Sequence, residues 1–312
     1  MGADALVTKD IERVADCIAA GGLAVVPTET VYGLAADAEQ PAAVARIFEV
    51  KGRPRTHPLI VHVGAANDLA RWVDAVPVHA AVLAQMCWPG PLTLLLHRSS
   101  RVPDAVTGGR DTVGVRVPAH PATLQVLART GGGLAAPSAN RYGAVSPTTV
   151  GHVLDDLGAL LDPARDVILD GGPSPVGVES TIVDCTVEPP QILRPGGIPT
   201  ETVAELIGTP IASPSGPSRA AGMVASHYAP RARVHLVDRP IDATAAASRL
   251  GAKGIEIRVI DGTDDLVRYA RNLYAELRDA DAHGCTDVIA VLPPPIGLGH
   301  AIRDRLQKAA TR

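Results

Sequence analysis

The sequence predicts an α/β fold in two parts joined by a linker. Short apolar segments alternate with amphipathic helical segments along most of the chain, as in layered α/β proteins. The strands expected in residues 180–194 follow one another without a helix between them, so the large sheet should be mixed and not purely parallel. A stretch rich in Pro, Ser, Gly and Ala separates a second alternation. We therefore expect domains at 1–207 and 231–312, with a linker at 208–230.

The first part should begin with a helix at about 8–20, because apolar residues recur there at helical spacing until Gly21-Gly22 ends it. The apolar run 23–26 is expected to be a strand, and Pro41 is suited to open a helix that ends near Lys51. Two helices are expected between 65 and 87, and others at 122–129 and 148–157. Further strands are expected at 59–63, 92–97, 112–117, 134–136, 167–170, 180–185 and 191–194.

The second part is a regular alternation of three strands and three helices. Strands are expected at 233–237, 255–260 and 287–292, and helices at 243–250, 264–281 and 298–309. Right-handed crossovers in such a unit give a short parallel sheet. We expect a small Rossmann-like α/β domain.

Composition excludes several classes of protein. With 46% hydrophobic and 20% charged residues, the composition is typical of a globular protein. A formal charge of -4 disfavours broad, charge-driven binding to nucleic acid or to an anionic membrane. The four cysteines form no CxxC pair, which fits a reducing cytoplasm and indicates neither a disulfide framework nor a zinc site. There is no signal-peptide pattern and no run of about 20 apolar residues, so a cytoplasmic protein without a membrane span is expected.

Polar residues gather in loops that directly follow predicted strands. In open α/β sheets, ligands bind beyond the strand ends, so these loops could line one cavity for an anionic ligand. Taken singly, each loop is more typical of turn and capping chemistry, and His62 on its apolar strand is more typical of a core histidine. No P-loop or dinucleotide-binding signature is present. The loops comprise residues 28–33, 51–57, 110–116, 137–146, 177–181 and 194–196.

The order of these loops carries a resemblance to a known family. Pro27-Thr-Glu-Thr-Val-Tyr-Gly-Leu34, Lys51-Gly-Arg-Pro54 and Pro58-Leu-Ile-Val-His62 closely resemble the YrdC-type family. So do the later segments Trp88-Pro-Gly-Pro-Leu-Thr93, Ala136-Pro-Ser-Ala-Asn140, Ser146-Pro147, Gly177-Val-Glu-Ser-Thr181 and Leu193-Arg-Pro-Gly196. Gly222-Met223 and His227-Tyr-Ala-Pro230 resemble the linker of the family's longer, two-domain members, which are threonylcarbamoyl-AMP synthases. The resemblance implies a YrdC-like twisted open mixed sheet at 1–207 and a linker that folds over the site as a lid.

The resemblance also implies a reaction. Such enzymes form threonylcarbamoyl-AMP and pyrophosphate from L-threonine, bicarbonate or CO2, and ATP, with Mg²⁺ accompanying the ATP and no bound transition metal. The product would pass to the machinery that makes threonylcarbamoyladenosine in tRNA, and tRNA itself is not required for this step. The chemistry needs alignment and charge stabilisation more than covalent help from the protein.

Site residues carry over position by position. Threonine would be held by Thr30, His62, Arg116, Ala136 and Ser180, with Arg116 as the bidentate partner of its carboxylate. Lys51 and Arg53 would stabilise phosphate charge during catalysis. Glu29 is a candidate acid or base. ATP would be bound by Lys51, Arg53, His57, Thr112, Ser138, Asn140, Ser146, Arg194 and Tyr228.

Two departures from the family pattern concern the nucleotide. His57 stands where the family usually has asparagine, and Val224-Ala225-Ser226 stands where Lys-Tyr-Arg is usual, so the lid lacks two cations. Two alternatives to threonine activation stay open. One is an enzyme of the same fold that makes carbamoyl-AMP, although such relatives usually carry extra large domains or zinc-finger cysteines. The other is a non-catalytic RNA-binding module, which the net charge disfavours.

Overall fold

The structure, a computed structural model, describes residues 5–209, 211–212, 228–252 and 254–311. The strands of the first part are β1 (Val7–Thr8), β2 (Ala24–Val26), β3 (Gly33–Asp37), β4 (Ile60–His62), β5 (Leu92–His97), β6 (Thr112–Arg116), β7 (Leu134–Ala135), β8 (Val167–Leu169), β9 (Thr181–Asp184) and β10 (Gln191–Arg194). Its helices are α1 (Ile11–Ala19), α2 (Pro41–Lys51), α3 (Leu69–Trp72), α4 (Val78–Cys87), α5 (Asp104–Thr107), α6 (Pro121–Thr130), α7 (Val150–Leu157) and α8 (Thr200–Ile207), with a 3-10 turn, η2, at Ala66–Asp68. The second part contains β11 (Arg233–Val237), α9 (Pro240–Gly251), β12 (Ile257–Ile260), α10 (Leu266–Ala282), β13 (Asp287–Val291) and α11 (Gly299–Ala310).

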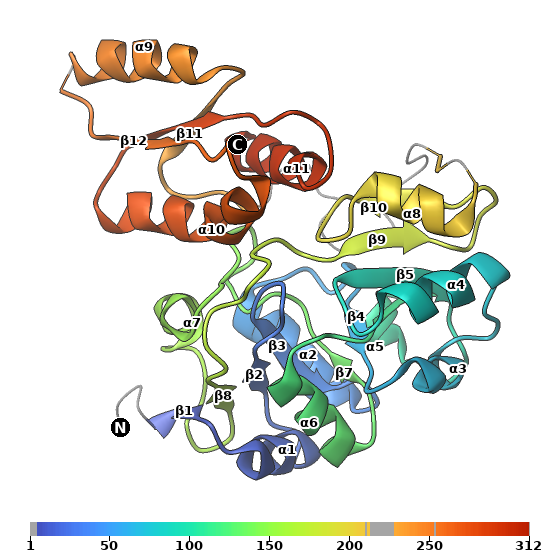
Figure 1. Cartoon of the computed structure of the whole chain (residues 1–312). Helices are drawn as coiled ribbons and strands as arrows, with labels where there is room; N and C mark the ends of the chain where they lie inside the picture. Colours follow the sequence, from blue (N-terminus) through green and yellow to red (C-terminus); the bar gives the residue numbers. More distant parts are fainter. Residues whose placement is uncertain (1–4, 210, 213–227, 253, 312) are drawn as a thin grey trace.

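The first part is built on one ten-stranded sheet in the order β1-β8-β2-β3-β7-β4-β6-β5-β9-β10 (Figure 1). The predicted mixed character is confirmed, because β4 pairs with β6 in parallel while β5 pairs with β6 antiparallel. The antiparallel β9–β10 pair explains why these strands need no helix between them.

Helices cover both faces of this sheet, and the alternation of side chains along the strands shows it. In β2, Ala24 and Val26 pack in one cluster with Val14 of α1 and Val126 of α6. Val25, between them, points into the main core with residues of α2, α4 and α7. Because both faces are buried, strand residues on either side are apolar, as in the run at 23–26.

Four elements escaped the sequence-based expectation: the two-residue strand β1, the one-turn helix α5, the strand β3 and the helix α8. The strand β3 lies where a polar loop was expected; its sequence Gly-Leu-Ala-Ala-Asp is poor in the β-branched and aromatic residues that signal strands. The helix α8 spans only eight residues between its N-cap Pro199 and the left-handed Gly208, which is short for recognition by periodicity.

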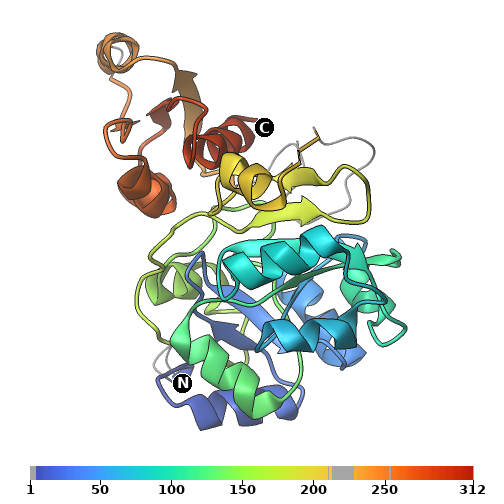
Figure 2. The same ribbon diagram turned by 45° about the vertical axis from the view of Figure 1, so that its right-hand side comes forward.

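The second part contains a three-stranded parallel sheet in the order β11-β13-β12, which confirms the predicted small α/β unit. Helices α10 and α11 lie on the side of this sheet that faces the first part, and α9 lies on the far side (Figures 1 and 2). Its core continues into the first part, because Val31, Val145 and Val178 belong to the same buried cluster as Leu273 and Leu277 of α10.

Most of the linker expected at 208–230 lies outside the described residues, including Gly222-Met223, Val224-Ala225-Ser226 and His227. Tyr228, where the description resumes, is buried and has a left-handed backbone with φ of 61°. Among the described residues no helix has the length and apolarity needed to cross a lipid bilayer.

Candidate active site

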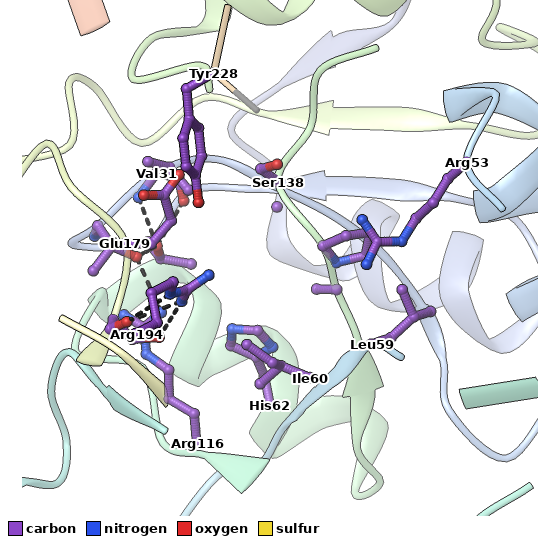
Figure 3. Close-up of a pocket in the computed structure, with 16 residues that line it drawn as sticks. Val31, Arg53, Leu59, Ile60, His62, Arg116, Ser138, Glu179, Arg194 and Tyr228 are labelled. Carbon is purple, nitrogen blue, oxygen red and sulfur yellow. Dashed lines mark hydrogen bonds between the residues drawn. The ribbon is translucent and has the colours of Figure 1, made fainter. Parts of the chain in front are cut away.

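A cavity of about 600 Å³, part of it open to solvent, lies where several loops and strand ends of the first part meet (Figure 3). His62 ends β4 and Arg116 ends β6, and the two residues are partners in this parallel strand pair. The loops before β3 and β9 and the loop after β7 complete the wall. Of the predicted site residues, those that line the cavity are Thr30, Arg53, His62, Arg116, Ala136, Ser138, Ser180, Arg194 and Tyr228.

Arg116 is held in a fixed orientation at the cavity wall. Its Nε donates to the carbonyl of Gly90 at 3.1 Å and its Nη1 donates to Thr30 Oγ1 at 3.0 Å. Its Nη2 donates to Oε1 of Glu29 at 2.5 Å, and the other oxygen of this carboxylate accepts from the amide of Ala119. Burial alone would raise the pKa of Glu29, but the charge and hydrogen bond of Arg116 hold that pKa below its usual value. Glu29 is therefore an anion that orients Arg116 and is poorly suited to be a general base.

His62 lies beside Arg116 and is buried. Burial, together with the nearby Arg116 charge, lowers the pKa of His62 to about 3, so the imidazole is neutral at physiological pH. Its Nδ1 is buried and has no hydrogen-bond partner among the described residues. A neutral ring with one unused nitrogen can hydrogen-bond a polar ligand group.

Ser180 and Arg194 form the next stretch of wall. The Ser180 hydroxyl lies 2.8 Å from Thr93 Oγ1 and accepts a hydrogen bond from Arg194 Nη2 at 3.0 Å. Arg194 also donates to the backbone carbonyl of Ser180, so the two side chains are placed together.

Arg53 approaches from the opposite side of the cavity, from the segment after α2 (Figure 3). Its Nη2 donates to the carbonyl of Pro58 at 3.0 Å, and its guanidinium lies 5.9 Å from the centre of the Tyr142 ring. Burial lowers the pKa of Arg53 to about 10, which leaves it cationic at neutral pH. Three arginines, Arg53, Arg116 and Arg194, thus line one cavity and make it suitable for an anion.

Lys51 does not line the cavity and lies behind its wall. The ammonium donates to the carbonyls of Ser138 and Asn140, each at 2.5 Å, and is fully buried. Burial, with the nearby charge of Arg53, lowers the pKa of Lys51 well below its usual value. In this structure Lys51 fixes the loop that carries Ser138, whose hydroxyl lies on the cavity.

Four other predicted nucleotide residues also lie outside the lining. His57 is half-buried, and its Nδ1 lies 3.3 Å from the Tyr142 hydroxyl. Thr112 is at the start of β6, four residues before Arg116, which places it roughly 13 Å along the strand. Asn140 donates to the carbonyls of Arg141 and Ala144, and so shapes the same loop as Lys51. Ser146 donates to Glu179 Oε1 at 2.7 Å.

Glu179 lines the cavity but was not among the predicted site residues, although it lies within the recognised segment 177–181. Taken alone it resembled a surface residue, yet it is 6% exposed. Burial alone would raise the pKa of Glu179, but the charges of Arg305 and Arg194 lower it to about 2.

Thr28 also lines the cavity and was not among the predicted site residues. Its hydroxyl lies 2.8 Å from Thr30 Oγ1 and helps to hold Thr30 in place. The spacing of Thr28 and Thr30, two hydroxyl residues separated by one position in a turn, is the sequence feature from which Thr28 could have been predicted.

Comparison with known proteins covers both parts of the chain. The family model described as telomere recombination, for Sua5, YciO and YrdC proteins, matches residues 16–196. The model for the C-terminal domain of threonylcarbamoyl-AMP synthase matches residues 198–311. The chain belongs to the Sua5 family.

Known relatives and a solved structure match this Sua5-type chain in sequence and in fold over nearly its full length. A threonylcarbamoyl-AMP synthase of Pyrococcus abyssi is 39% identical, covering 96% of this chain and 94% of the relative. One from Bacillus subtilis is 36% identical, covering 98% and 95%. The crystal structure of Pyrococcus abyssi Sua5 complexed with L-threonine superposes with a TM-score of 0.91 at 38% identity, covering 98% of this chain and 96% of that one. The long, two-domain form of the family, inferred from the motifs, is confirmed.

Proposed function

We propose that this Sua5 family member is an L-threonylcarbamoyladenylate synthase, which forms threonylcarbamoyl-AMP and pyrophosphate from L-threonine, bicarbonate or CO2, and ATP. The observation that carries the proposal is the single cavity onto which Arg53, Arg116 and Arg194 converge with the hydroxyls of Thr30, Ser138 and Ser180. Such a wall suits a carboxylate at one end and a polyphosphate at the other.

Two bond-forming steps make up the reaction. The neutral amine of threonine adds to the carbon of CO2 and releases a proton, which gives a carbamate. A carbamate oxygen then attacks the α-phosphorus of ATP and pyrophosphate leaves, with its bonding electron pair remaining on the leaving oxygen. Neither step requires a covalent intermediate with the protein. Alignment of the two reactants and stabilisation of phosphate charge supply the acceleration.

The threonine end of the cavity is proposed at Arg116, with Thr30, His62, Ala136 and Ser180. The three hydrogen bonds of Arg116 use one N–H on each of its nitrogens, so a second N–H on Nη1 and on Nη2 is left for a carboxylate. The unused Nδ1 of neutral His62 is suited to a hydroxyl or amine of the same substrate.

The ATP end is proposed at Arg53 and Arg194, with Ser138 and Tyr228 on the wall. Lys51, Asn140 and Ser146 act from behind it, because they hydrogen-bond within the loops that form this end. His57 and Thr112, which lie outside the lining, are proposed to contact a more distant part of the nucleotide. Mg²⁺ is proposed to arrive with the triphosphate, since arginines and hydroxyls surround the cavity and three-residue groups of metal-ligand side chains do not occur among the described residues.

The product is proposed to serve the transfer of the threonylcarbamoyl group to tRNA by separate machinery. The cytoplasm is the proposed location, since ATP and tRNA are available there. The four free cysteines, Cys17, Cys87, Cys185 and Cys285, are compatible with that reducing compartment.

Pyrophosphate release from ATP, with threonine and bicarbonate omitted in turn, tests this function. We expect release only when both are present. Release that does not depend on threonine would overturn the proposal. Release supported by carbamoyl phosphate in place of threonine and bicarbonate would indicate a carbamoyl-adenylating enzyme instead.

A further inference from the structure

The carboxylate of Glu179 connects the two parts of the protein. Its Oε1 accepts from the Ser146 hydroxyl in the first part. Its Oε2 accepts from the Tyr274 hydroxyl of α10 and from Arg305 Nε of α11, each at 2.7 Å. Both oxygens of a cavity-lining side chain are thus fixed, one by a residue of its own domain and one by the C-terminal domain.

Arg305 is an unusual residue for a small α/β unit because its side chain is completely buried. Besides Glu179, its guanidinium bonds to Asp304 and lies 5.1 Å from the ring centre of Tyr228, which lines the cavity. A buried arginine opposite a buried carboxylate is costly to break, since removal of either one leaves an unpaired charge. The contact therefore defines one position of Glu179 relative to α11.

Helix α10 makes further contacts with the same two cavity loops. Arg278 donates to the carbonyl of Val145, next to Ser146, and pairs with Asp156 of α7 at 2.6 Å. At Gly177, a Cβ would lie 2.4 Å from the Cα of Arg271, and the backbone φ is +79°. Glycine is required there because α10 approaches the loop so closely. A motif of the catalytic domain is thus shaped by the C-terminal domain.

We propose that Arg305 is a positioning residue for the ATP end of the cavity, acting through Glu179 and Tyr228. The C-terminal domain then contributes part of the nucleotide site although none of its described residues, 231–252 and 254–311, lines the cavity. This inference rests on the proposed function, because it assigns the same cavity to ATP. Ser180, which follows Glu179, is held separately by Thr93 and Arg194, so the threonine end should be affected much less.

The full-length chain should be compared with Arg305→Met, Arg305→Lys, Glu179→Gln and the double variant Arg305→Met/Glu179→Gln. Arg303→Met is the matched control, since Arg303 lies on the same helix and donates to the carbonyl of Pro293 within its own domain. The measurements are the dissociation constant of ATP without threonine, the KM of threonine, and thermal unfolding. ATP binding is measured without turnover, so this test does not depend on the reaction. If the wild type failed to release pyrophosphate in a threonine-dependent way, the proposed function would be contradicted, but the positioning role of Arg305 would not.

We expect Arg305→Met to weaken ATP binding about tenfold or more, the effect of losing one charged contact, with the KM of threonine within about twofold. Arg305→Lys should recover part of the loss. The double variant should bind no more weakly than the poorer single variant, because the two residues act as one unit. Gly177→Ala, which pushes α10 away without removing a charge, should weaken ATP binding in the same direction.

Three results would overturn the positioning role. The first is ATP binding in Arg305→Met equal to that in Arg303→Met. The second is an equal loss for ATP and threonine, which describes a general structural residue. The third is a double variant whose loss equals the product of the single losses. If Arg305→Met does not fold, Arg305→Lys and Gly177→Ala decide by the same comparison.

Discussion

Arg116 donates through Nη2 to Oε1 of Glu29 at 2.5 Å, and both side chains are less than a tenth exposed. The pair lies where β6 meets the loop before β3, beside the neutral ring of His62. An ion pair in such a place holds the guanidinium still before any ligand arrives, so binding need not supply that ordering. The pair is therefore both a support of the fold and part of the proposed threonine site.

Glu29→Gln should destabilise the protein by about 3 kcal/mol, because it leaves the Arg116 charge buried without its partner. Chemical denaturation measures this change. The matched control is Glu12→Gln at the exposed pair with Arg129, where a loss below about 1 kcal/mol is expected. Equal effects at the two sites would contradict the importance of the buried pair.

Arg116→Lys should raise the KM of threonine about tenfold and leave the KM of ATP within about twofold, since lysine keeps the charge but cannot make the two-pronged contact. Steady-state pyrophosphate release with each substrate varied separates the two constants. If the KM of ATP rose instead, the two ends of the cavity would be assigned the wrong way round.

Lys51→Met should lower kcat by about a hundredfold, because it frees the loop that presents Ser138 to the phosphates, and misplaced groups cost that much. It should also destabilise the fold by about 2 kcal/mol, since the carbonyls of Ser138 and Asn140 lose their buried donor. Kinetics and denaturation on the same samples are needed. A loss of stability with unchanged kcat would limit Lys51 to a structural role.

Stability should depend on pH through His62. Above pH 6.5 the ring is neutral in both the folded and unfolded states. As the pH falls below 6.5 the unfolded chain takes up a proton, while the folded chain, with a pKa of about 3, does not, so stability is lost. The loss attributable to His62 should reach about 2 kcal/mol at pH 5.

Urea denaturation at pH 7 and pH 5 tests this pH dependence. The difference between the two pH values should shrink in His62→Gln and should be unchanged in the control His283→Gln, whose side chain is 68% exposed. An unchanged difference in His62→Gln would show that the imidazole is not held neutral by burial.

The sequence was sufficient to predict the α/β class, the mixed sheet and the small parallel sheet, because these follow from periodicity and from the order of elements. The strand β3 was not recognised, since its Gly and Ala residues become buried only through the neighbours β2 and β7. Tertiary pairing determined that strand, and local propensity did not.

Many residues that line the cavity, including Arg116, His62 and Arg194, could likewise be predicted from the order of the motifs. What could not be predicted is which motif residues reach the cavity and which support it. Lys51 reads as a phosphate ligand from its motif, but its ammonium is held by backbone carbonyls. Arg305 carries no sequence signal at all, because one arginine on an amphipathic helix gains its meaning only when the two domains come together.

The most direct test of threonine activation is the identity of the product. The purified chain is incubated with ATP, Mg²⁺, L-threonine and ¹³C-bicarbonate. The nucleotides are then separated, and their masses are determined by mass spectrometry. We expect threonylcarbamoyl-AMP that carries one ¹³C, and its disappearance when threonine is omitted. AMP or ADP alone, or an adenylate without the label, would contradict this expectation.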